Sequence, residues 1–268
     1  MTSFHNSRLG ASVRRSNSYH GRHKVIAAGI AALGMGMAAA PAHAQAADTT
    51  GFYLGLHVGI SSVSDTDITY YDTSGTFGGT GQQDTAVGVF DVDKTTSFGG
   101  SIGYDFGMIR SDIELDYSRA KINSLTISQV NGQAITLSPE DRAEVCDYLE
   151  VDTCGGSGNT FEVPGARVRQ ASAFLNAWVD LPIGGVIAPY AGGGVGVAGF
   201  ETDGEGTAKF AWQLGAGVAA HFSETVAVTL DYRRRQLSAA DIAYDANSGF
   251  ELGKLKTDTF AAGVRFTF

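Results

Sequence analysis

TDTFAAGVRFTF, residues 257–268, ends the sequence on a strict two-residue alternation. Phe260, Ala262, Val264, Phe266 and Phe268 take every second position, and small, polar or charged residues stand between them. Because successive side chains of a strand point to opposite faces, this stretch predicts a β-strand with one apolar and one polar face. A soluble protein seldom leaves such a strand as an open edge. In a closed barrel it pairs on both sides and lipid covers its apolar face, so the stretch favours a membrane β-barrel.

The composition agrees with this hypothesis. The chain has 268 residues, of which 36 are Gly and only 18% are charged, and its mean hydropathy is -0.01. A barrel whose residues alternate between lipid and lumen averages to such an intermediate hydropathy.

The N-terminal residues read as an export signal. Residues 1–24 contain five basic residues and no acid, residues 25–40 are apolar, and Ala42-His43-Ala44 forms an A-x-A cleavage pattern. We therefore expect cleavage after Ala44, which leaves residues 45–268 as the barrel domain. A membrane anchor is the alternative, but the apolar run is short for a hydrocarbon core about 30 Å thick. Without the signal, 14 basic residues stand against 28 acidic ones, a formal net charge of -14. Such a charge argues against nucleic acid as a partner.

Eight stretches repeat the period of two. They cover residues 51–60, 95–106, 109–118, 168–181, 187–200, 210–222, 226–235 and 257–268. Long connections, expected as loops over 61–94, 119–167, 201–209 and 237–256, alternate with short turns. This layout predicts an all-β fold, an eight-stranded antiparallel up-and-down transmembrane barrel with long extracellular loops and short periplasmic turns. The facing of the fourth strand stays open, because Leu175 and Trp178 put large apolar side chains on both of its faces.

Charged residues occupy the inward positions of three predicted strands. An eight-stranded interior is only wide enough for side chains to fill it, and unpaired charges there would be costly. The pattern favours a network of ion pairs inside the barrel, with a conducting pore as the alternative. The predicted members are Arg110, Asp112, Glu114, Asp116, Asp231, Arg233 and Arg265.

Two cysteines, Cys146 and Cys154, lie eight positions apart in the longest predicted loop. In an exported protein such a pair favours a disulfide. A zinc site would need two more ligands nearby, and none is evident in the sequence.

Three further patterns in the sequence have simpler explanations than a functional site. Residues 194–199 match the nucleotide motif GxGxxG, but a strand rather than a helix follows, so no cofactor is predicted. The first long loop is rich in Asp, which suits calcium or magnesium, but it lacks EF-hand spacing, and no metal site is predicted. His221 and Ser223 suggest a lipid-modifying barrel enzyme, yet Ser223 falls in a predicted periplasmic turn; His57 is no better placed, and no catalytic residue is predicted.

Four segments carry a family resemblance: AFLNAWVDLPIGGVIAPYAGGGVGVAG (173–199), FAWQLGAGVA (210–219), VTLDYR (228–233) and GVRFTF (263–268). They resemble the small outer-membrane β-barrel families typified by the membrane domain of OmpA, OmpX, the opacity-type proteins and the "porin family" surface proteins of alphaproteobacteria. The resemblance implies an integral protein of the Gram-negative outer membrane. It also implies that a C-terminal signal, here Phe266 and Phe268, is read by the outer-membrane assembly machinery.

The expected function is that of a non-enzymatic surface protein, serving envelope integrity, antigenicity or adhesion through its long loops. Expected partners are outer-membrane lipid and lipopolysaccharide, the assembly machinery, and a host or surface ligand of the loops. A narrow porin-like diffusion channel is the first alternative, and a lipid-modifying barrel enzyme is the second.

Overall fold

The computed structural model describes residues 50–64, 66–73, 84–149, 154–181, 186–202, 205–243 and 247–268. The predicted signal, residues 1–44, lies outside these ranges, as does Asp65 of the first acidic segment.

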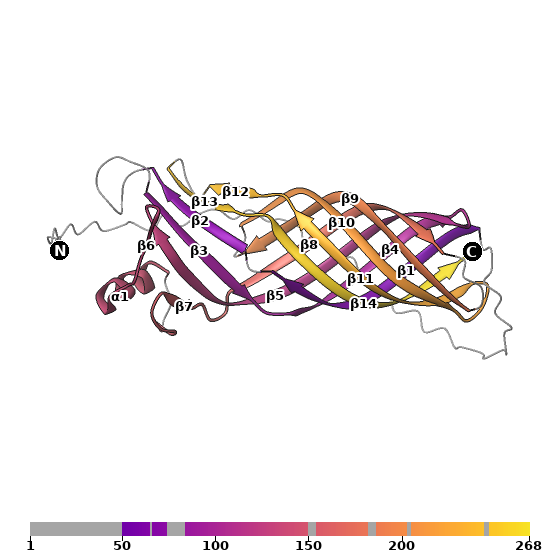
Figure 1. Cartoon of the computed structure of the whole chain (residues 1–268), viewed down its shortest axis with the longest axis horizontal. Coiled ribbons are helices and arrows are strands. Elements are labelled where there is room, and N and C mark those ends of the chain that lie inside the picture. Colours follow the sequence, from indigo (N-terminus) through magenta and orange to yellow (C-terminus); the bar gives the residue numbers. More distant parts are fainter. Residues whose placement is uncertain are drawn as a thin grey trace, which may run out of the picture. The chain divides into compact units, whose positions relative to one another are not determined.

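Eight antiparallel strands close into a ring (Figure 1). Each strand pairs with the next around the ring, and β14 (Leu255–Thr267) pairs back with β1 (Gly51–Val63), placing Phe260 opposite Ile60. Every predicted strand is present, so the eight-stranded barrel is confirmed, and the C-terminal stretch is paired on both sides. In ring order the strands are β1 (Gly51–Val63), β4 (Thr95–Asp105), β5 (Ile109–Val130), β8 (Arg167–Asp180), β9 (Ile187–Thr202), β10 (Glu205–His221), β11 (Val226–Leu237) and β14 (Leu255–Thr267).

The outer wall of the ring is apolar. Phe52 and Phe260 are each 66% exposed, and similar side chains from all eight strands lie around them. The structure also settles the facing of β8, since Leu175 is 58% exposed whereas Phe174 and Trp178 are buried in the interior. A ring with an apolar outside and a polar inside is suited to lipid surroundings.

Short turns join the strands at one end of the ring, which we call the turn end. Between β4 and β5, Gly107 has a φ of 101°, a conformation that side chains disfavour, and its amide donates to the Asp105 carboxylate at 2.8 Å. The opposite end, which carries the long connections, is the loop end.

The long connections are not plain loops, which corrects the sequence-based expectation for residues 61–94, 119–167 and 237–256. They contain β2 (Thr66–Asp72), β3 (Asp84–Val92), β12 (Ala240–Ala243) and β13 (Ser248–Leu252), which join the far half of β5 in a second sheet of order β12-β13-β2-β3-β5. Residues 201–209 also belong mostly to β9 and β10. The pairings of the added strands continue the pairings of the ring strands to which they are joined. Their β-branched and aromatic residues favour extended backbone.

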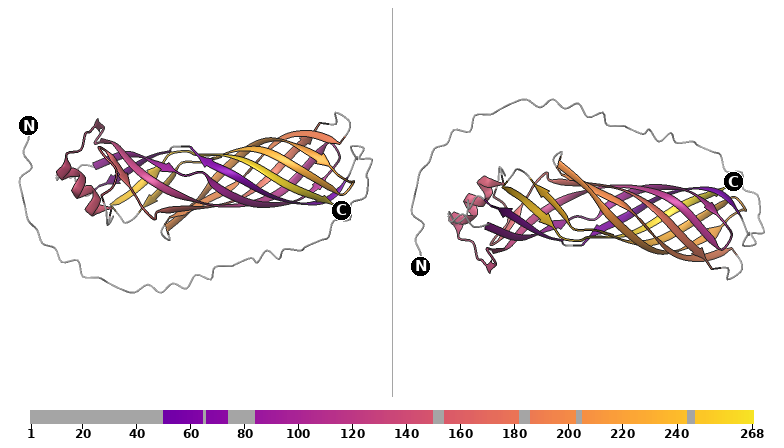
Figure 2. Two further views of the ribbon diagram at one scale, coloured as in Figure 1. Left: turned by 90° about the horizontal axis from the view of Figure 1, so that it is seen from below. Right: turned by 90° about the horizontal axis from the view of Figure 1, so that it is seen from above.

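We call this second sheet, with β6 (Gln133–Ala134), β7 (Thr160–Glu162) and α1 (Pro139–Tyr148), the head. Figure 2 shows the head strands following the ring at the loop end, away from the C-terminus. The inner face of the sheet is apolar next to the ring, where it packs on side chains from the loop end of the barrel interior, so head and barrel share a core. The cluster comprises Phe174, Phe200, Leu237, Ala240 and Leu252, with Ile68, Ile242 and Phe250 against them. Farther from the ring, the buried residues Asp72 and Asp84 lie opposite each other in the pairing of β2 with β3.

Three local contacts fix helix α1 and the segment that follows it. Ser138 caps its N-terminus, with its hydroxyl accepting from the amide of Asp141. Arg142 donates to the carbonyls of Gly155, Gly158 and Thr160, and its guanidinium lies 4.6 Å from the centroid of the buried Phe161 ring. The predicted disulfide is confirmed: Cys146 and Cys154 are bonded, with their Cα atoms 5.6 Å apart.

Replacing both cysteines with serine is expected to loosen this part of the head while the barrel stays folded. A bridge that closes a loop of this size contributes about 2–3 kcal/mol by restricting the unfolded chain. Limited proteolysis of the purified protein should therefore cut between residues 139 and 162 much faster in the double variant. Reduction of the wild-type protein should reproduce the effect and should not change the double variant. Equal cleavage of all samples would contradict a stabilising role for the bridge.

Candidate functional site

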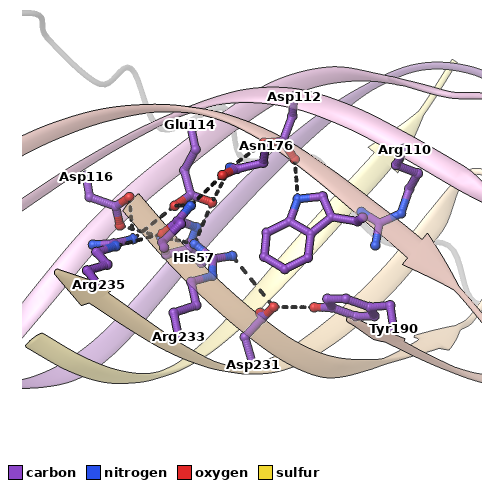
Figure 3. Close-up of polar contacts among 12 residues, drawn as sticks. His57, Arg110, Asp112, Glu114, Asp116, Asn176, Tyr190, Asp231, Arg233 and Arg235 are labelled. Atoms are coloured by element: carbon purple, nitrogen blue, oxygen red, sulfur yellow. Dashed lines mark hydrogen bonds and ion pairs between the residues drawn. The ribbon is translucent and has the colours of Figure 1, made fainter. Parts of the chain in front are cut away.

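The interior of the barrel holds a dense polar network (Figure 3). The alternation of each strand sends every second side chain inward, so β5 supplies four charged residues in series. The structure places all seven predicted members in this interior, with exposures between 1% and 7%. They are Arg110, Asp112, Glu114, Asp116, Asp231, Arg233 and Arg265.

A central ion-pair layer, formed by Glu114, Asp116, Arg233 and Arg235, crosses the barrel from β5 to β11. Glu114 is 1% exposed; its two oxygens lie 2.7 Å from Arg233 Nη1 and 2.9 Å from Arg235 Nη2. Arg235 Nη2 also donates to Asp116 at 2.7 Å, and Asp116 lies 2.8 Å from His57 Nε2. Each carboxylate in this layer therefore meets a guanidinium, which offsets the cost of its burial.

Neutral side chains complete the layer. Gln213 Nε2 donates to Glu114 at 3.1 Å and to Asn176 Oδ1 at 2.7 Å, while Gln213 Oε1 accepts from Arg235 at 2.9 Å. Room for these groups comes from inward glycines, because a Cβ on Gly194 would collide with Asn176 and one on Gly99 would collide with His57. Gly194 belongs to the GxGxxG match, so the motif serves packing between β8, β9 and β10.

Among the described residues, no cation lies within ion-pair distance of Asp112. Its carboxylate accepts from Tyr53 Oη at 2.6 Å, from Asn176 Nδ2 at 2.7 Å and from Trp178 Nε1 at 3.1 Å. Three neutral donors thus satisfy this buried carboxylate, which we had expected from the sequence to form an ion pair.

Toward the turn end, Arg110 makes two hydrogen bonds to Asp180, and its guanidinium lies 4.9 Å from the centroid of the Tyr190 ring. Tyr190 in turn donates to Asp231. Arg265 differs from Arg110 and Arg233, since none of its nitrogens lies within ion-pair distance of a carboxylate among the described residues. Its Nη1 has no hydrogen-bond partner there, and its guanidinium lies 5.9 Å from the Tyr53 ring centroid. The prediction that Arg265 joins an ion pair is wrong for the described part of the chain.

Two cavities of about 40 Å³ flank the central ion-pair layer. One, toward the loop end, is lined by Ser97 and Arg235 among others; the second, toward the turn end, is lined by Tyr53, Asp231 and Arg265 among others. Each has room for water, since a cavity needs only about 10–15 Å³ of such space to hold one water molecule. Buried polar atoms without a protein partner, such as Ser97 Oγ and Arg265 Nη1, belong to residues that line them. Side chains thus fill the layer that separates the two cavities.

The candidate catalytic residues have structural contacts instead. Ser223 Oγ accepts from the amides of Thr225 and Val226 at 3.3 and 3.1 Å and so stabilises the turn between β10 and β11. His57 is engaged by Asp116 and lies 3.3 Å from Arg233 Nη1. Within the described ranges, no group of three or more His, Cys, Asp and Glu side chains is placed to hold a metal ion. The same residues include no helix long and apolar enough to cross a membrane.

The neutral partners were missed by sequence reasoning. Asn176 and Trp178 stand in phase with Asp180 on one face of β8, and that spacing is a signal that would have identified the inward face. Tyr53 and Gln213 likewise alternate with exposed residues of their strands.

At the C-terminus, Phe268 is 80% exposed, and its amide donates to the carbonyl of Phe52 at 2.8 Å. Recognition of Phe266 and Phe268 by the assembly machinery remains a prediction.

Comparison with known proteins finds curated relatives, solved structures and a family model that are similar to this chain. An uncharacterized protein of Brucella abortus (strain 2308) is 30% identical over 163 residues, 54% of this chain and 52% of that protein. An uncharacterized protein of Brucella suis biovar 1 is 29% identical over 168 residues, again 54% and 52%. The chain spans about half the length of these curated relatives.

Among solved structures, Neisserial surface protein A aligns with a TM-score of 0.47 at 16% identity, covering 81% of this chain and 97% of that one. The outer membrane protein OprG of Pseudomonas aeruginosa aligns with a TM-score of 0.47 at 14% identity, covering 82% and 98%. A family model described as "Outer membrane protein beta-barrel domain" matches residues 30–268. The chain belongs to this family and is an integral protein of the outer membrane.

Proposed function

We propose that the protein is a non-enzymatic surface protein whose barrel is closed by its interior network and whose head is a binding surface outside the cell. The observation that carries this proposal is the combination of a filled interior with a folded head. The central ion-pair layer crosses the lumen, and the cavities on either side of it measure only about 40 Å³ each. Passage of solutes through the barrel would not explain a folded head, whereas recognition of a ligand by the head would.

The orientation follows from the two ends of the ring. In outer-membrane barrels the long connections face the exterior and the short turns face the periplasm. The head therefore lies outside, where a disulfide suits the oxidising surroundings. The described strands of the head are held by ladders that continue those of the barrel, so this part of its surface is positioned before any ligand binds. Preorganisation of this kind lowers the entropic cost of binding.

Two measurements test the closed barrel and its orientation. Purified protein in planar lipid bilayers should show no discrete conductance, and steps of steady current would overturn the closed barrel. On intact cells a membrane-impermeant amine reagent should label Lys94 and Lys254, which are exposed at the base of the head. Labelling that appears only after the cells are broken would invert the orientation.

Binding by the head is tested with cells that produce either the whole protein or a variant in which short turns replace the head segments. Retention on immobilised glycoproteins should be severalfold higher for the whole protein. The gel mobility of unboiled samples checks that both barrels are folded. Equal retention across the panel would assign the protein to envelope integrity instead.

Assembly gives a further prediction. Phe268→Ser is expected to lower the amount of folded protein in the outer membrane severalfold, because the proposed C-terminal signal loses its aromatic end. Phe106→Ser, which changes a similarly exposed aromatic residue at the turn end, is the matched control. Immunoblots of unboiled outer-membrane fractions measure the folded form. Equal losses in both variants would attribute the effect to a missing membrane contact.

A further inference from the structure

Four basic side chains form a two-by-two block on the outer wall of the barrel. In the pairing of β5 with β8, Arg119 lies opposite Arg169 and Lys121 lies opposite Arg167. All four residues are exposed. Cross-strand partners of this kind have Cβ atoms about 4.5–5.5 Å apart, and like charges so placed repel each other. We call these four residues the basic block.

The protein does little to neutralise this charge. Arg169 lies 2.8 Å from Glu201, in a pair whose side chains are 46% and 41% exposed and therefore well hydrated. Among the described residues, Arg119, Lys121 and Arg167 have no carboxylate within ion-pair distance. Asp91 and Asp93 on the neighbouring segment are bound by the side-chain amide of Asn123. In a chain with a large excess of acids, such a block points to an anionic ligand.

The block sits where the lipid-facing wall ends. On β5 the outward series includes Ile113, Leu115 and Tyr117, which are 54%, 60% and 47% exposed, and continues with Arg119 and Lys121. On β8, chain direction is reversed, and Arg167 and Arg169 precede Leu175 on the same face. A tyrosine between an aliphatic surface and basic residues is typical of the membrane interface. The basic block therefore lies at the level of lipid head groups, on the loop-end side.

We propose that the basic block binds the phosphate groups of phosphorylated glycolipid in the outer leaflet. The assignment to that leaflet rests on the orientation in the proposed function. A guanidinium can grip a phosphate through two parallel hydrogen bonds, and a lysine adds a compact charge. Three arginines and one lysine on adjacent strands thus offer a rigid site, because the backbone of both strands is fixed by the ring. Bound phosphate also removes the repulsion within the block.

The test uses the whole mature protein in phosphatidylcholine nanodiscs with or without purified lipopolysaccharide. The block variant carries Arg119→Gln, Lys121→Gln, Arg167→Gln and Arg169→Gln. The matched control carries Lys94→Gln, Arg234→Gln, Lys254→Gln and Lys256→Gln, which remove the same charge from other exposed positions. Native mass spectrometry measures retained lipopolysaccharide. Wild type and control should retain it, while the block variant should bind about fivefold more weakly for each charge removed near an anionic surface.

Two further arms identify the ligand. Enzymatically dephosphorylated lipopolysaccharide should bind wild type no better than it binds the block variant. Inorganic phosphate at millimolar concentration, without lipopolysaccharide, should not raise the temperature at which the wild-type barrel loses its folded gel mobility. Undiminished binding by the block variant, equal losses in the control, or equal binding of dephosphorylated lipid would each overturn the proposal. Stabilisation by inorganic phosphate alone would replace the lipid with a free anion. None of these readouts depends on orientation, which the labelling of intact cells tests separately.

Discussion

Glu114→Ala is expected to destabilise the barrel by about 3–5 kcal/mol, the cost of removing one partner from a buried charge pair. The carboxylate is 1% exposed and meets both Arg233 and Arg235, so its loss strands two guanidinium groups in the interior. Gln213 would also lose an acceptor. The midpoint of urea unfolding in detergent, followed by gel mobility of unboiled samples, measures the change.

Two comparisons separate the effect of breaking a buried ion pair from the effect of removing a charge. Arg234→Gln breaks the exposed pair with Asp258, whose atoms are 3.6 Å apart, and should cost less than about 1 kcal/mol. The double variant Glu114→Ala, Arg233→Met should recover part of the lost stability, because one of the two stranded charges is gone. A Glu114→Ala protein as stable as the Arg234→Gln protein would show that the layer contributes nothing to the fold.

Leu230→Arg is expected to impair the barrel through its outer face. Leu230 is 58% exposed on β11, between Val228 and Tyr232 on the lipid-facing series. A charge near the midplane of the bilayer costs about 2–4 kcal/mol in outer-membrane barrels. Refolding into phosphatidylcholine vesicles, followed by gel mobility, should show a corresponding loss of the folded form.

Asp67→Arg provides the matched control, since Asp67 is exposed on the outer side of β2 in the head. Water surrounds that position if the ring alone spans the membrane, so the substitution should change stability by no more than about 0.5 kcal/mol. Equal tolerance of both substitutions would contradict the placement of the bilayer around the ring.

Sequence alone predicts the ring because lipid enforces the period of two. A one-residue slip would turn every apolar side chain inward, and Phe260, Val264 and Phe266 therefore specify both the strand and its register. The charged members of the interior follow from the same parity. Arg110, Asp112 and Glu114 alternate with Ile109, Ile113 and Leu115, and no other facing is compatible with the membrane.

The head cannot be predicted in this way. Water covers its outer face, so the difference in hydrophobicity between the two faces of its strands is smaller. TDITYYD, residues 66–72, carries polar and aromatic side chains on both faces, so its strand depends on partners far away in sequence. Ser248 to Leu252 of β13, for example, pairs with β2 from the opposite end of the chain. The neutral donors around Asp112 are equally non-local, as Tyr53 comes from β1 and Trp178 from β8.

The 22 residues of β5, Ile109–Val130, run without interruption from the turn end of the ring into the head. A ligand that pulls on the head therefore loads β5 along its own axis. Its neighbours in the ring, β4 and β8, resist that pull because their backbone hydrogen bonds to β5 are perpendicular to the direction of the force. Many of these hydrogen bonds must break together before β5 can slide. For the proposed binding role, β5 thus gives the head a continuous covalent link to the ring that can bear load.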